Sequence, residues 1–302
     1  MTFGVLAATV ALFAALPFVV DRWAAPRASP AGLVTLAMVR LAGLLLAPLA
    51  LAACLAQLAG HHAGLGGATL GLAMALAALT IGRALWATWR AEDEWRRIGA
   101  ALLAAGVPGP SGVTVVPLAA PTAFVAGDRI VVSAALFDAL DPAELEAVLA
   151  HETAHLRGGH PRIAAWAHAL SRGSFQIPPA RAAESRVRQQ LELLADRHVV
   201  DTLHNPEPIR AAMAKLSDGG PGGSQRLDIG HLTHERLRCL LAAPSSAAAD
   251  RLVTITTAIL AAVIVAAVCG ALHVRLAGLG IAVCGLTATG LWSLLRPLHR
   301  PA

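Results

Sequence analysis

Five long apolar runs constrain what this chain can fold into more than any other feature of its sequence. They cover residues 3–20, 35–59, 64–86, 252–274 and 277–295. Each approaches or exceeds the roughly 20 residues that a helix needs to cross the hydrocarbon core of a bilayer. Charged residues make up only 14% of the chain, whereas a soluble domain carries about 25%. These features predict a multi-spanning α-helical membrane protein, with the lipid bilayer as one partner.

The positions of the arginines predict an orientation for these runs, because basic residues favour the cytoplasmic side of a membrane. The loop at His61–His62 and the N-terminal tail carry no Lys or Arg, and the turn between the last two runs carries Arg275 alone. The basic clusters all fall on the opposite side of the predicted topology: Arg22, Arg27, Arg83, Arg90, Arg96, Arg97, Arg251, Arg296 and Arg300. We therefore expect a multi-pass protein of the inner (plasma) membrane with its N-terminus outside. The short turn near residue 275 leaves a re-entrant hairpin open as an alternative for the last two runs.

This topology divides the chain into three parts. Residues 1–86 would form a membrane domain of three transmembrane helices, and residues 251–302 a hairpin of two transmembrane helices with a short cytoplasmic tail. The segment 87–250 would be a cytoplasmic domain, long enough to bury one core. Short β-branched or apolar runs at 113–116, 123–125 and 130–132 predict strands. Helices are expected over 91–105, 161–172, 180–203 and 206–216, so the domain is α+β and mostly helical.

One further helix of this segment has clear start and stop signals. Asp141 is an N-cap residue, Pro142 stands at the first helical position, and Glu144 completes a capping box. The helix should end near Arg157, because two glycines follow it.

His151-Glu152-Thr153-Ala154-His155 lies inside this capped helix. Residues four apart share a helix face, so both imidazoles can reach a single zinc ion. Glu152 lies beside them and can take a proton from an attacking water molecule without binding the metal. The pattern predicts one catalytic Zn²⁺, with His151 and His155 as ligands and Glu152 as the general base.

A catalytic zinc needs a third protein ligand and an open fourth position. His160 comes one position too early for the metzincin pattern, and His168 on the next helix has no other support. Glu192 and Asp196 are four residues apart on a predicted helix, so one can bind the metal while the other orients a ligand histidine. We favour Glu192 as the third ligand and Asp196 as the orienting residue.

Several segments together resemble the HtpX-type and BlaR/MecR-type membrane zinc peptidases. They are the runs 122–125, 130–133 and 145–152, followed by Glu192-Leu193-Leu194-Ala195-Asp196. In those families an edge strand leads to a second strand, a helix bearing HExxH and a later helix bearing ExxAD. The resemblance covers about residues 90–240 and implies a gluzincin-like zinc peptidase domain with His151, His155 and Glu192 as ligands. It also implies that an edge strand at Ala123, Phe124 and Val125 binds substrate by β-augmentation.

A second, shorter stretch, residues 231–237, weakly resembles the HP…ER[IL] element of HtpX-type enzymes. Arg236 matches that element, and either His231 or His234 is a candidate for stabilising an oxyanion. His231 and Arg236 are therefore added to the predicted catalytic residues.

The functional prediction is an integral membrane zinc endopeptidase that cleaves protein substrates on the cytoplasmic side. The order of the runs is similar to the BlaR/MecR branch without its penicillin-binding sensor, which suggests signalling by regulated cleavage of a cytoplasmic transcriptional repressor. One alternative is membrane-protein quality control of the HtpX type. Another is a non-catalytic scaffold or receptor with structural zinc, for which His160 would be the fourth ligand. Direct nucleic-acid binding is not expected, since the net charge of +5 is small and concentrated beside the runs.

Overall fold

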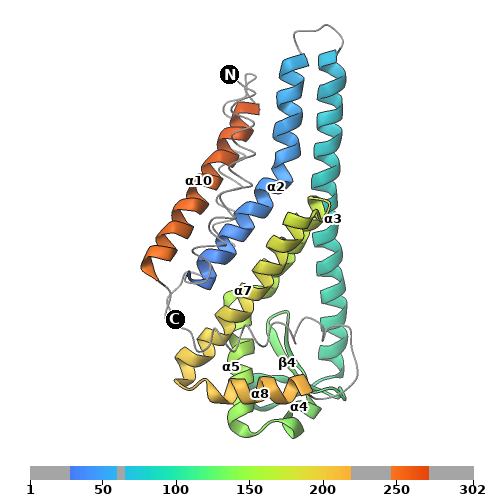
Figure 1. Ribbon diagram of the computed structural model, residues 1–302. Coiled ribbons are helices and arrows are strands. Elements are labelled where there is room, and N and C mark those ends of the chain that lie inside the picture. Colours follow the sequence, from blue (N-terminus) through green and yellow to red (C-terminus); the bar gives the residue numbers. More distant parts are fainter. Residues whose placement is uncertain (1–27, 60–64, 219–245, 272–302) are drawn as a thin grey trace. The chain divides into compact units, whose positions relative to one another are not determined.

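The structure is a computed structural model that describes residues 28–59, 65–218 and 246–271 (Figure 1). Its internal contacts divide the chain into two compact units. We call the first the helical unit; it comprises residues 1–89, 163–187 and 244–302. We call the second the mixed unit; it comprises residues 90–162 and 188–243. The apolar runs predicted at 3–20 and 277–295 lie outside the described residues.

Three helices occupy the other apolar runs: α2 (Pro30–Ala59), α3 (Leu65–Ala105) and α10 (Ala247–Ala271). Across the described ranges, the structure contains no helix that combines the length and the apolarity needed to cross a membrane. The prediction of a multi-spanning membrane protein is therefore wrong, and with it the predicted spans at 35–59, 64–86 and 252–274.

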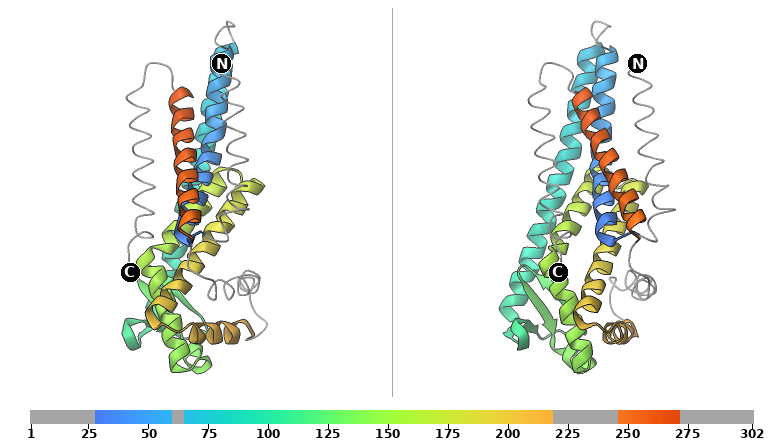
Figure 2. Two further views of the ribbon diagram at one scale, coloured as in Figure 1. Left: turned by 60° about the vertical axis from the view of Figure 1, so that its left-hand side comes forward. Right: turned by 90° about the vertical axis from the view of Figure 1, so that its left-hand side faces the viewer.

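The buried residues of the helical unit give the physical reason for this error. Helices α2 and α10 lie side by side (Figures 1 and 2). Leu33 and Leu36 of α2 are buried in one cluster with Val253 and Leu260 of α10. Hydropathy counts an apolar side chain in the same way whether it packs against protein or lipid. Part of the apolarity of α2 and α10 is therefore used to pack these two helices together, whereas Leu72, Leu79, Ile81 and Leu85 of α3 are exposed.

A small four-stranded sheet lies in the mixed unit. Its strands are β1 (Val107–Pro108), β2 (Thr114–Val116), β3 (Ala123–Ala126) and β4 (Arg129–Ser133), in the order β1-β2-β4-β3. β2 runs parallel to β4, whereas β1 pairs antiparallel with β2 and β3 pairs antiparallel with β4. Gly127 has a φ of 64° in the turn between β3 and β4, a conformation that favours glycine. The three predicted strands are confirmed, and β3 is an edge strand.

Helix α5 (Pro142–Gly158) packs against β3, β4 and α8 (Glu207–Asp218), while α4 (Ala134–Ala139) follows β4 directly (Figure 1). The buried cluster between these elements includes Val132, Leu136, Val148, Val199 and Ile209. Full burial of such a side chain stabilises the fold by about 1.5–3 kcal/mol. The mostly helical fold with a small sheet agrees with the α+β prediction for this segment.

Lys215, the single lysine of the chain, forms an ion pair that links α8 to the start of α5. Its Nζ lies 2.6 Å from Oε2 of Glu144, whose side chain is buried. A buried carboxylate needs such a partner, because its desolvation in an apolar core would otherwise cost several kcal/mol.

Helices α6 (His160–Gly173) and α7 (Pro178–Leu203) complete the described fold. Each has residues in both units. Between them, Phe175 and Gln176 have φ values of 56° and 50°, which is unfavourable for residues with a Cβ atom. Arg83 supports this turn, since its guanidinium lies 4.7 Å from the centre of the Phe175 ring and its Nε donates to the carbonyl of Arg172.

Candidate metal centre

The helix that carries the HExxH motif is held firmly at both ends. Asp141 Oδ1 accepts from the backbone N–H of Glu144 at 2.9 Å, and Glu144 Oε2 accepts from the backbone N–H of Asp141 at 2.8 Å. This capping box satisfies two backbone donors that would otherwise have no helical partner. At the other end, Gly159 adopts the left-handed conformation with a φ of 62°. The predicted helix and both of its boundary signals are confirmed, so His151 and His155 occupy adjacent turns of a regular helix.

The structure brings the three predicted metal ligands together in the mixed unit. His151 Nε2 and His155 Nε2 lie 3.0 Å apart on α5. Glu192 extends from α7, with one oxygen 3.5 Å from His151 Nε2 and the other 3.4 Å from His155 Nε2. Donor atoms of these residues lie within 4.8 Å of one another.

This group fits a zinc ion in both chemistry and size. Two imidazoles and one carboxylate are a common ligand set for catalytic zinc, with metal–ligand bonds of about 2.0–2.2 Å. Tetrahedral geometry at those bond lengths places the donor atoms roughly 3.3–3.6 Å from one another. The separations of 3.0, 3.4 and 3.5 Å are close to that requirement. Three protein ligands leave the fourth position open for water or substrate.

Asp196 lies behind His151, on the side of the ring opposite Glu192. Its Oδ1 is 3.0 Å from His151 Nδ1, and only 1% of its side chain is exposed. The ring is turned so that this contact is an ion pair rather than a well-aligned hydrogen bond. Burial lowers the pKa of His151, but the carboxylates of Asp196 and Glu192 outweigh it and raise the pKa to about 9. The structure therefore places Asp196 where the sequence predicted an orienting residue.

His160 lies behind the other ligand, His155. The two Nδ1 atoms are 2.9 Å apart, and His160 is only 4% exposed. Burial and then the charge on His155 lower the pKa of His160 to about 3. Because Glu192 approaches His155 from the Nε2 side, His160 is not placed to be a metal ligand. His160 was weighed as a possible ligand, a helix cap or a surface residue, and its contact with Nδ1 of a ligand histidine was not predicted.

The glycines before His160 were the available signal for this contact. A Cβ atom on Gly158 would lie 2.4 Å from Nε2 of the His160 ring. Gly159 turns the chain from α5 into α6, which returns the imidazole toward α5. A Gly-Gly-His sequence that begins three residues after His155 is therefore compatible with a histidine whose ring turns back to contact the second ligand.

The remaining predicted site residues fall into two groups. Glu152 is half-buried on α5, and Ala123, Phe124 and Val125 are half-buried on the edge strand β3. His231 and Arg236 lie outside the described residues, as does the alternative His234.

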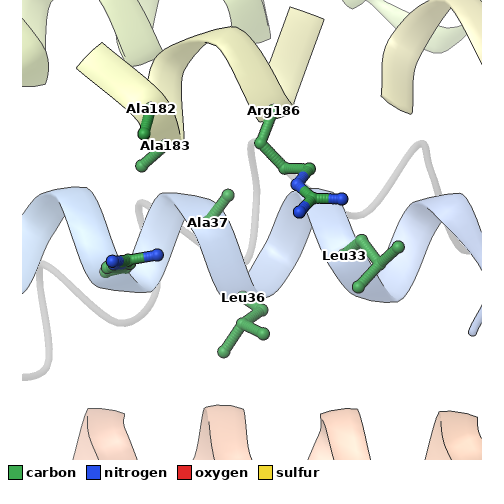
Figure 3. A pocket seen from close by; sticks show the side chains of 7 residues that line it. Leu33, Leu36, Ala37, Ala182, Ala183 and Arg186 are labelled. Carbon is green, nitrogen blue, oxygen red and sulfur yellow. The ribbon is translucent and has the colours of Figure 1, made fainter. Parts of the chain in front are cut away.

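Two features of the helical unit do not belong to this metal centre. His168 Nδ1 lies 2.9 Å from Glu184 Oε1, within that unit, so a carboxylate already accounts for this histidine. A cavity of about 70 Å³ lies between α2 and the first half of α7 (Figure 3). That volume would hold only about two water molecules, so it is too small for a peptide. Its lining residues are Leu33, Leu36, Ala37, Arg40, Ala182, Ala183 and Arg186.

Comparison with known proteins finds matches for the segment that carries the HExxH motif. Residues 88–189 match Peptidase family M48. The chain is also 32% identical over 108 residues to the plastoglobule-localized metallopeptidase 48 of Arabidopsis thaliana chloroplasts. That alignment covers 33% of this chain and 31% of the relative, so the chain matches about a third of the relative's length. No solved structure matches the chain.

These matches confirm the predicted enzyme class, a zinc metallopeptidase, for the matched segment. The family match ends at residue 189, before Glu192 and Asp196. The placement of those two carboxylates beside the histidines therefore comes from the structure alone.

Proposed function

We propose that this chain is a zinc-dependent endopeptidase that cleaves extended segments of protein substrates. The convergence of His151, His155 and Glu192, with Asp196 behind the first histidine, carries this proposal. The match of residues 88–189 to a metallopeptidase family supports it independently.

Glu152 is the residue that moves the proton in this proposal. When bound, zinc acidifies a water molecule and polarises the carbonyl of the scissile peptide bond. Glu152 follows His151 directly on α5 and accepts a proton as the water oxygen attacks the carbonyl carbon. The same carboxyl then gives that proton to the departing amine nitrogen as the C–N bond breaks. Glu152 is unchanged after the reaction, and one water molecule has been consumed.

The free edge of β3 supports an extended peptide as the substrate. β3 pairs only with β4, so no strand among the described residues pairs with its outer edge. A peptide added there would be recognised mainly by its backbone, because main-chain hydrogen bonds provide the affinity in this mode. The predicted repressor substrate depended on counting membrane spans, and the described helices remove that support. We therefore define the substrate by its extended backbone.

A structural zinc scaffold is a poorer fit to this site. A closed site needs a fourth protein ligand, and His160, the candidate from the sequence, faces His155 Nδ1 instead.

The direct test compares the purified full chain with its Glu152→Gln variant. We expect both proteins to bind about one zinc per chain. The test substrate is casein, whose chain is largely extended. The wild type should cleave it, and the cleavage rate of the variant should be at least about 10²–10⁴-fold lower. Zinc content is measured by elemental analysis and cleavage by the release of peptides. Equal cleavage by the two proteins, or no zinc in either, would contradict the proposal.

Backbone recognition has its own test. Two synthetic peptides of one cleavable sequence are compared, and one of them carries N-methyl groups on alternate backbone amides away from the cut site. Two lost hydrogen bonds at about 1 kcal/mol each predict a fall in kcat/KM of roughly 30-fold. Equal cleavage of both peptides would show that β3 does not bind the substrate backbone.

A further inference from the structure

His160 is a buried polar side chain that the proposed reaction does not use. It is 4% exposed and begins α6, just past the left-handed turn at Gly159. Its ring stands nearly perpendicular to that of His155, with the ring centres 4.8 Å apart and an interplanar angle of 88°. The Nδ1 atoms of the two rings lie 2.9 Å apart. This distance is that of a hydrogen bond, so one nitrogen must donate and the other must accept.

Metal binding decides which nitrogen donates. His155 faces Glu192 and His151 through its Nε2, so the lone pair for the metal must be on that atom. The proton of a neutral imidazole then sits on the other nitrogen, which makes His155 Nδ1 the donor. His160 Nδ1 must be the acceptor, and His160 carries its own proton on Nε2.

We propose that His160 is a positioning residue for zinc binding, which accepts a hydrogen bond from His155 Nδ1 and thereby fixes the ring and the tautomer of that ligand. This inference rests on the proposed function, since it takes His151, His155 and Glu192 as the zinc ligands. In this arrangement each ligand histidine has a different partner behind it: a carboxylate, Asp196, for His151 and a neutral imidazole for His155.

The neutral His160 ring adds no charge to the zinc site. Glu192 and Asp196 already place two carboxylates around the ligand histidines. A third carboxylate behind His155 would further reduce the positive charge that zinc presents to a water molecule or a carbonyl. His160 orients His155 without adding that negative charge, so a zinc ion held by these ligands would keep more of its positive charge for polarising water and the peptide carbonyl.

The local backbone is built to accept this ring. A Cβ atom on Gly158 would lie 2.4 Å from His160 Nε2 and 2.6 Å from Cδ2. Any other residue at position 158 would force the imidazole away from His155. Glycine at position 158 therefore leaves the space that the His160 ring occupies.

The test uses three variants of the full chain that differ in where they present an acceptor. His160→Asn places its amide oxygen close to the position of Nδ1, so it keeps the acceptor. His160→Gln places its oxygen near the position of Nε2, and His160→Phe keeps a ring with no acceptor. His168→Phe is the matched control, because His168 is also on α6 but pairs with Glu184 in the helical unit.

Zinc affinity is measured at pH 7.5 by competition with a fluorescent chelator. Loss of a residue that orients a metal ligand typically weakens metal binding by about 10–100-fold. We expect a loss of that size for His160→Phe and His160→Gln, and an affinity within about threefold of wild type for His160→Asn and His168→Phe. The visible absorption of the cobalt-substituted proteins gives a second measure of the ligand geometry. This absorption spectrum should differ from wild type for His160→Phe and His160→Gln but not for His160→Asn.

The outcomes separate this inference from the proposed function. If the wild type binds no zinc, the proposed function fails. If it binds zinc and His160→Phe binds equally well, only the role of His160 is overturned. Equal losses for Asn and Gln would also overturn that role, since they would show that the ring acts through its packing alone. Should the Phe variant fail to fold, the comparison of Asn with Gln decides the question.

Discussion

Different kinds of interaction stabilise the metal centre of the mixed unit and the packed helices of the helical unit. At the metal centre, short contacts between named polar atoms fix the geometry, such as the 3.0 Å separation of His151 Nδ1 and Asp196 Oδ1. In the helical unit, Leu33 and Leu260 are buried in an apolar cluster that packs α2 against α10. Polar geometry depends on atoms at defined positions, whereas apolar burial depends mainly on area.

This difference explains which region could be understood from the sequence. A spacing of four residues in a helix predicts which polar side chains meet, so it led to the metal ligands. An apolar run gives no indication of what covers it, so it led to the wrong prediction of membrane spans. The predictions below test whether changes in one region leave the other unaffected.

The largest effect is expected for Glu192→Gln. This change replaces an anionic ligand with a neutral amide, and it should weaken zinc binding by well over 100-fold, more than the loss of an orienting residue costs. Glu184→Gln on the same helix is the matched control, because Glu184 pairs with His168 in the helical unit. Competition with a chelator measures the zinc affinity of both variants. An unchanged zinc affinity in Glu192→Gln would remove Glu192 from the site.

The next largest effect is expected for Leu260→Ala in the helical unit. Leu260 is fully buried, and truncating such a leucine costs about 2–5 kcal/mol of unfolding free energy. Ile259→Ala is the matched control, because the neighbouring Ile259 is 41% exposed and should cost much less. Denaturant unfolding gives the free energies, and zinc titration of the folded variant should match the wild type. A loss of zinc affinity in Leu260→Ala would show that the two regions are coupled.

Asp196→Asn should have an intermediate effect, a loss of zinc affinity of about 10–100-fold. The amide keeps the size of the side chain but no longer supplies a negative charge behind His151. Its matched control is Asp201→Asn, a change of an exposed aspartate on the same helix. If Asp196→Asn binds zinc like the wild type, Asp196 does not orient His151.

The same contact predicts a pH dependence for the protein stripped of metal by a chelator. The pKa of His151 is raised from 6.5 to about 9. A raised pKa stabilises the folded state fully below the ordinary value of 6.5, and this stabilisation is lost as the pH rises through 9. The melting temperature of the stripped wild type should fall between pH 6.5 and 9.5, and that of Asp196→Asn should fall less. Parallel profiles would contradict the cause assigned to the shift.

The smallest effect is expected for Asp141→Ala, which removes the N-cap of α5. Such a change typically costs about 1 kcal/mol of unfolding free energy. Asp138→Ala is a matched control, since Asp138 lies nearby, is exposed, and takes no part in the capping box. Denaturant unfolding compares the two. Zinc affinity should remain close to wild type, because His151 lies more than two turns further along the helix.

Local rules predicted α5 and its motif well because every signal lies within one helix. Asp141, Pro142 and Gly159 each act on backbone groups a few residues away, so their effect is visible in the order of residues. The pair Glu192 and Asp196 came from a resemblance to known families together with helical spacing. Their approach to His151 joins residues about forty positions apart, which only the folded chain shows.

Other features depend on contacts between separate elements, and only Gly158 and Gly159 before His160 offered a local signal for one of them. The contact of His160 with His155 depends on the left-handed turn at Gly159, which reverses the chain after the motif. Strand β1 is only two residues long and forms by pairing with β2. The burial of Leu33 against Val253 joins residues far apart in the sequence. In each case the tertiary structure, rather than local propensity, determines the outcome.

The most direct test of the central claim is X-ray absorption spectroscopy at the zinc edge of the purified, zinc-loaded chain. The site described above predicts a first shell of nitrogen and oxygen at about 2.0–2.2 Å, with the multiple-scattering pattern of two imidazoles and no sulfur. His151→Ala should lose one imidazole from that shell. A sulfur shell at about 2.3 Å would place the metal on cysteines instead, and would contradict a site built from His151, His155 and Glu192.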